Sequence, residues 1–132
     1  MIKKTITFTD WNGTTRTEDF YFNLTQTECV ELEYSSGMGK SMSASINELV
    51  RNQDMAVIIK ILKDIILKSY GEKSDDGRRF IKSEEISTAF SQTPVFDMLY
   101  MELATDADKA AEFINGIIPT DTAIRPKIVS NK

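Results

Sequence analysis

Few side chains in this sequence are of the types that carry out chemistry. The 132 residues include no histidine and a single cysteine, Cys29. Histidine is the most frequent general base and metal ligand in proteins, and a structural zinc site needs four Cys or His ligands. Structural zinc, haem bound through histidine, and Ser–His or Cys–His catalysis are therefore excluded within this chain. The composition leaves only chemistry that is based on carboxylates or on lysine.

Three pairs of carboxylates could suggest a site, and none of their spacings fits one. Asp75-Asp76 lacks the alternating ligands of a calcium-binding loop. Glu84-Glu85 would point about 100° apart on a helix, and Asp106-Ala107-Asp108 stands where acidic residues favour the start of a helix. We therefore predict no catalytic residue, no metal site and no cofactor.

The segment of residues 35–45 is rich in serine and glycine and contains Gly39-Lys40-Ser41. A phosphate-binding loop would need a glycine five residues before Gly39, where Tyr34 stands, and a buried strand before it, where we expect a helix. We interpret the segment as a mobile loop whose two methionines, Met38 and Met42, dock on a partner.

Charge and hydropathy limit the kinds of partner. The chain has 16 basic and 20 acidic residues, and the basic ones do not cluster as a phosphate-binding surface would require. The most apolar stretch, 56–67, carries three charges and is shorter than the roughly 20 residues that span a bilayer. No signal peptide is recognisable. We expect no nucleic acid or membrane partner, a cytoplasmic protein, and Cys29 as a reduced thiol in the core.

The first 22 residues predict a β-hairpin around the turn at Asp10-Trp11-Asn12-Gly13. A two-residue Asn-Gly turn would place the apolar side chains of the two strands on opposite faces. A three-residue loop, 11–13, with Gly13 in the left-handed conformation places all of them on one face. We prefer this second register. The apolar residues concerned are Ile2, Ile6, Phe8, Phe20 and Phe22.

About six helices are predicted after the hairpin, each with a recognisable start or stop signal, such as the capping box Thr25-Gln26-Thr27-Glu28 and the cap at Ser83. The longest, 55–70, is apolar over most of its circumference, so we predict that it is the central element of the core. Gly71 is expected as its left-handed C-cap and Gly116 as the stop of the last helix. The expected helices cover residues 25–34, 45–51, 55–70, 84–92, 94–104 and 105–115.

These elements predict a helix-dominant α+β fold in one domain over residues 1–118. The hairpin and the helices need each other, because an isolated hairpin is marginally stable. Residues 119–132 have two prolines and no periodicity, and we expect them to be a mobile tail.

Helix 94–104 carries more apolar residues than one helix face can bury. It is either wedged between two neighbours or exposes part of its apolar surface to a partner. Methionine and aromatic side chains suit the second role, since they adapt to varied surfaces. The candidate partner-binding residues are Met38, Met42, Phe96, Met98, Tyr100 and Met101.

Three stretches of the sequence resemble a known family. They are TITFTDWNGTTRTEDFYFNLTQTE (5–28), SYGEKSDDGRRFIKS (69–83) and AFSQTPVFDMLYMELATDADKAAEFINGIIP (89–119). These stretches are similar in sequence to the tail assembly chaperones of long-tailed bacteriophages and prophages of Gram-positive bacteria. Such chaperones are encoded between the genes of the tail tube protein and the tape measure protein.

The resemblance implies a non-enzymatic protein that binds the tape measure protein and tail tube subunits in the host cytoplasm during tail morphogenesis. It also implies absence from the mature virion and, in many such phages, a longer frameshifted form. Self-association through the exposed edge of the hairpin stays open. Two alternatives remain: a structural tail or head–tail connector component retained in the virion, and a phage protein that binds a host factor.

Overall fold

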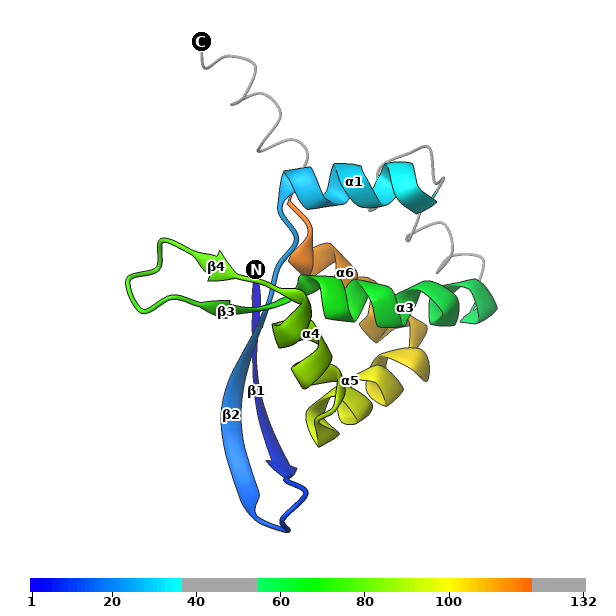
Figure 1. The fold of residues 1–132 in the computed structure, drawn as a ribbon. Coiled ribbons are helices and arrows are strands. Elements are labelled where there is room, and N and C mark those ends of the chain that lie inside the picture. The colour runs from blue at the N-terminus through cyan, green and yellow to red at the C-terminus, as the bar shows by residue number, and fades with distance from the viewer. Residues whose placement is uncertain (37–54, 120–132) are drawn as a thin grey trace.

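The computed structural model describes residues 1–36 and 55–119 and shows an α+β fold (Figure 1). One four-stranded sheet has the order β1-β2-β3-β4. Helices α3, α4, α5 and α6 lie on one side of the long hairpin, and α1 lies at one end of the molecule (Figure 1). The elements are β1 (Ile2–Thr9), β2 (Thr15–Phe22), α1 (Gln26–Ser36), α3 (Met55–Ser69), β3 (Tyr70–Lys73), β4 (Phe80–Ile81), α4 (Glu84–Ser91), α5 (Pro94–Ala104) and α6 (Ala107–Ile117).

The register of the first hairpin is the one that the three-residue loop predicts. Ile2 lies opposite Phe22 and Thr9 opposite Thr15, and Gly13 has a φ of 86°. Asp10 organises the loop, because its carboxylate accepts hydrogen bonds from two loop backbone N–H groups and from Arg16. All five apolar side chains of the two strands belong to the core or pack against it, while threonines cover the other face.

Aromatic rings fill the space between the sheet and the helices. Phe22 of β2 contacts Phe113 of α6 and Phe90 of α4, with ring centroids 5.3 and 5.8 Å apart. Tyr70 of β3 stacks on Phe90 at 4.0 Å. The sheet and the helices therefore share one core, as the marginal stability of an isolated hairpin requires.

Helix α3 does not match the prediction of a central helix. Leu62, Ile65 and Ile66 are buried against α4, α5 and α6, but Ile59 is 39% exposed. The helix covers one side of a core whose middle is filled by aromatic rings from other elements. The described residues form five helices rather than six, and the helix predicted over 45–51 lies outside them.

The helix starts were predicted well because capping is local. The hydroxyl of Thr25 accepts a hydrogen bond from the Glu28 N–H, and the Glu28 carboxylate accepts one from the Thr25 N–H, which completes the expected capping box. Ser83 caps α4, as predicted. Ala89 of that helix is exposed.

Gly71 is not a left-handed helix cap. It lies inside β3 opposite Tyr21, and its φ is not positive. A Cβ at this position would stand 2.8 Å from a ring carbon of Phe80 and 3.0 Å from the carbonyl oxygen of Ile81. Glycine is therefore required by close packing between β3 and β4. The charged residues 71–79 belong to this second hairpin, which turns at Gly77 with a φ of 76°.

Gly116 is likewise a packing position and not a stop signal. Helix α6 continues through it to Ile117. A Cβ on Gly116 would lie 2.6 Å from the Cδ1 atom of Ile2, so its absence lets β1 approach the helix closely.

None of the helices in the described ranges combines the length and the apolar character that crossing a bilayer would require. The predicted domain boundary at residue 118 is not tested by the structure, because residues 120–132 lie outside the described part of the chain.

We predict that Gly71→Ala destabilises the fold by about 1–3 kcal/mol, because the added methyl group overpacks the space beside Phe80 and the Ile81 carbonyl. Urea denaturation measures the loss. Phe80→Leu combined with Gly71→Ala should cost less than the sum of the two single changes, since the smaller side chain makes room. A left-handed cap would instead tolerate Gly71→Asn nearly unchanged, a result that would contradict our assignment.

Candidate functional site

The acidic residues singled out in the sequence shape turns and helix ends. The carboxylate of Asp76 accepts hydrogen bonds from the Arg78 N–H and the Ser74 hydroxyl, which hold its pKa below the ordinary value. Asp106 caps α6 by accepting from two backbone N–H groups. Within residues 1–36 and 55–119, no three Asp, Glu, Cys or His side chains are placed to hold a metal ion. Cys29 is buried, as predicted.

Helix α5 exposes part of its apolar surface. Its buried stripe consists of Val95, Leu99 and Leu103, spaced by four residues. Met98 is 45% exposed and Met101 is 50% exposed. The expectation of more apolar residues than the helix can bury is therefore confirmed. The positions Met38 and Met42 lie outside the described residues.

The four predicted residues of α5 divide between two sides of the helix. At about 100° per residue, Met98 and Met101 lie on one flank of the buried stripe, and Phe96 and Tyr100 lie on the other. The two aromatic residues are half-buried, with ring centroids 6.0 Å apart, and Phe96 also contacts the ring of Phe90. The methionine flank is thus the accessible one.

A groove runs between β1 and the methionine flank of α5. Its volume is about 560 Å³. In the order of the sheet, β1 is an edge strand, and the backbone of an edge strand offers hydrogen-bonding groups to another chain. An ion pair between Lys4 Nζ and Glu102, 3.9 Å apart, closes part of the groove. The lining residues are Lys4, Thr5, Ile6, Thr7, Met98, Leu99 and Glu102.

Trp11 is an exposed aromatic residue at the tip of the first hairpin. Its side chain is held although the residue is 78% exposed, because the indole N–H donates a hydrogen bond to the carbonyl oxygen of Gln92, 3.0 Å away, just before α5. The sequence pattern predicts Trp11 as a turn residue alone. A tryptophan in a loop of otherwise polar residues was the signal available in the sequence.

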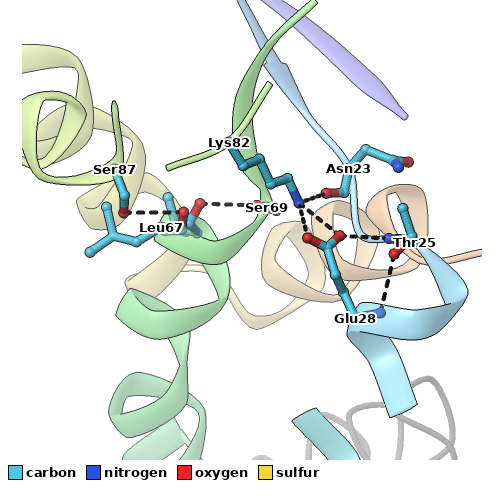
Figure 2. Close-up of polar contacts among 8 residues, drawn as sticks. Asn23, Thr25, Glu28, Leu67, Ser69, Lys82 and Ser87 are labelled. Atoms are coloured by element: carbon cyan, nitrogen blue, oxygen red, sulfur yellow. Dashed lines mark hydrogen bonds and ion pairs between the residues drawn. The ribbon is translucent and has the colours of Figure 1, made fainter. Parts of the chain in front are cut away.

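A second cleft, of about 490 Å³, lies between α1, the end of α3 and α4. Figure 2 shows the polar contacts beside it, which centre on Lys82. The Nζ atom of Lys82 donates to both carboxylate oxygens of Glu28, at 2.8 and 2.9 Å, and to the carbonyl oxygen of Asn23 at 2.7 Å. This contact ties the start of α1 to the segment before α4. Sequence spacing did not indicate it, since the two charges are 54 positions apart.

Comparison with known proteins places this fold in a family. The family model described as phage tail assembly chaperone matches residues 1–128. The chain belongs to this family. Searches of curated proteins and of solved structures returned no significant match.

The match confirms the resemblance on which we based the functional expectation, and it assigns this tail assembly chaperone to the building of a phage tail. The match covers both the β1–α5 groove and the cleft beside α1.

Glu28 has two roles at the start of α1. Partial burial raises the pKa of its carboxyl group, but hydrogen bonds from Lys82 and from the Thr25 N–H outweigh this effect. The pKa of Glu28 therefore lies below the ordinary value of 4.5. The ionised carboxylate stabilises the fold above about pH 4.5, and this stabilisation is lost as the pH falls through the lower pKa of the folded protein.

We predict that Glu28→Gln lowers the free energy of unfolding at pH 7 by about 1–2 kcal/mol, because the charge-assisted bonds to Lys82 are weakened. The amide can still accept from the Thr25 N–H, so Glu28→Ala should cost roughly 1 kcal/mol more. Urea denaturation at pH 7 and pH 3 measures both losses. The free energies of unfolding of the wild type and Glu28→Gln should converge at the lower pH.

Glu102→Gln is the matched control, since its ion pairs with Lys4 and Lys109 are longer, at 3.9 and 3.6 Å, and more exposed. The Glu102→Gln change should lower the free energy of unfolding by less than about 0.5 kcal/mol. An equal loss in Glu102→Gln and Glu28→Gln would contradict the special role of the Lys82 contact.

Proposed function

We propose that this tail assembly chaperone binds the tape measure protein, and tail tube subunits, through the methionine flank of α5. It does so in the cytoplasm of a Gram-positive host, without catalysing a reaction. The observation that carries the proposal is the exposure of Met98, which lines a groove bordered by an edge strand, and of Met101 on the same flank of the helix. Both residues were among the partner-binding candidates of the sequence.

The chemistry of the flank suits a long helical partner. Unbranched methionine side chains adapt to different apolar surfaces at little cost, so one flank can accept successive segments of a long helix. An amphipathic helix presents apolar side chains three and four residues apart, and Met98 and Met101 have the same spacing. The Trp11 ring adds a fixed apolar surface near the start of α5.

The size of this surface favours reversible binding. Each methionine is already about half-buried, so complete burial contributes on the order of 1 kcal/mol per side chain. A chaperone that leaves before the tail is complete needs contacts of this modest strength. Met38 and Met42, which lie outside the described residues, are further partner-binding candidates of this proposal, and a longer frameshifted form and self-association belong to it as well.

The first test of the proposal is co-expression with the tape measure protein. We expect the wild-type chaperone to co-purify with it and to raise its soluble fraction. Met98→Gln combined with Met101→Gln should weaken binding about tenfold or more, because two apolar contacts become polar while helix propensity is kept. Circular dichroism should show an unchanged fold.

The matched control replaces two exposed apolar residues elsewhere, Val30→Gln combined with Ile59→Gln, which are 42% and 39% exposed in the wild type. This variant should bind like the wild type. If it loses as much affinity as the methionine variant, the flank of α5 is not the binding surface. If the wild type neither co-purifies with the tape measure protein nor raises its solubility, the function itself is wrong.

We also predict that mass spectrometry of purified virions finds the tube and tape measure proteins and lacks this chain. A temporary assembly factor leaves the particle, whereas a connector or another structural component stays in stoichiometric amounts. Detection of the chain at a fixed copy number per virion would favour the structural alternative.

A further inference from the structure

The cleft beside α1 has an apolar floor and a charged rim. Its apolar part consists of Leu24, Leu32 and Leu67 with the ring of Tyr70. At the rim, Glu31 of α1 and Glu84 of α4 come from opposite sides, together with Lys68. A volume of about 490 Å³ is enough for several side chains. The cleft therefore fits a short peptide segment with both apolar and charged side chains.

The rim keeps an excess of negative charge. Lys82 is engaged by Glu28, so that these two charges offset each other. Within the described ranges, Glu31, Glu84 and Lys68 take part in no ion pair. Two carboxylates against one ammonium group favour an occupant with positive charge.

A segment of this composition follows the last helix. Residues 120–132, with the sequence TDTAIRPKIVSNK, contain three basic side chains and one acidic one. The apolar residues stand next to the basic ones. The basic residues are Arg125, Lys127 and Lys132, and the largest apolar ones are Ile124, Ile128 and Val129.

The segment also begins a few residues after a contact with the cleft lining. The Leu24 N–H donates a hydrogen bond to the carbonyl oxygen of Ile117, 2.8 Å away, so the chain leaves α6 beside a residue that lines the cleft. Thirteen extended residues reach about 43 Å, whereas the 11 residues of α1 measure roughly 16 Å. Every part of the cleft is within reach.

We infer that residues 120–132 bind in the cleft between α1 and α4 of their own chain, with apolar side chains against Leu32 and Leu67 and basic ones beside Glu31 and Glu84. Tethering gives the segment a local concentration in the millimolar range, so weak contacts are enough. The cis-bound segment then covers the apolar floor of the cleft. The inference is independent of the proposed binding through α5.

The test is NMR spectroscopy of the full-length, isotope-labelled chain. We expect methyl NOEs from Ile124 or Ile128 to Leu32 or Leu67, and backbone relaxation of residues 122–129 slower than that of a free peptide. Glu31→Gln combined with Glu84→Gln should lower the ratio of bound to free segment by about threefold to tenfold, as expected for the loss of two exposed ion pairs. Arg125→Gln combined with Lys127→Gln should have the same effect and leaves the described residues untouched.

Glu85→Gln is the matched control, because Glu85 is exposed on the same helix and does not line the cleft. Its spectra should match those of the wild type. The inference is overturned if residues 120–132 relax as a free chain in the wild type, as the mobile tail predicted from the sequence would. It is also overturned if Glu85→Gln releases the segment as strongly as the rim variants do.

Discussion

The register of the β1–β2 hairpin is the constraint on which the rest of the structure depends. A slip of one residue would turn Phe20 and Phe22 to solvent and bring polar residues into the core. The three-residue loop with Gly13 at positive φ excludes that slip. With the register fixed, Phe22 meets the rings of Phe90 and Phe113, so one loop conformation decides whether the sheet and the helices can share a core.

The same arrangement explains where binding surface remains. The sheet buries one face, and α5 contributes a single stripe of three side chains to the core. On the methionine flank of α5, Met98 and Met101 stay exposed, and Met98 lines the groove beside the edge strand β1. Figure 1 shows α5 on the side of the hairpin where the helices gather. A small α+β domain with one core thus offers apolar surface to a partner without exposing its interior.

What the sequence could predict was set by how local the physical cause is. The hairpin register and the caps at Thr25 and Ser83 depend on residues a few positions apart, and they were found. Gly71 and Gly116 were misread as helix stops, because the ring of Phe80 and the side chain of Ile2 that make glycine necessary come into contact only in the folded structure. In the candidate site, the exposed methionines could be predicted from crowding on one helix. Trp11 and Lys82 could not, since their partners are 81 and 54 positions away.

Helix α1 has a well-capped start, but few of the described contacts join it to the rest of the fold. Its capping box is complete, and the contacts that join it to the rest of the fold include the packing of Leu24, Cys29 and Leu32, the ion pair of Glu28 with Lys82, and backbone hydrogen bonds from Asn23 to Ser69 and from Leu24 to Ile117. Elements held by few buried contacts open at a lower free energy than the core does. The hairpin and the helices packed on it share most of the buried side chains and the ring contacts of Phe22, so they set the stability of the fold, and α1 is expected to open before they do.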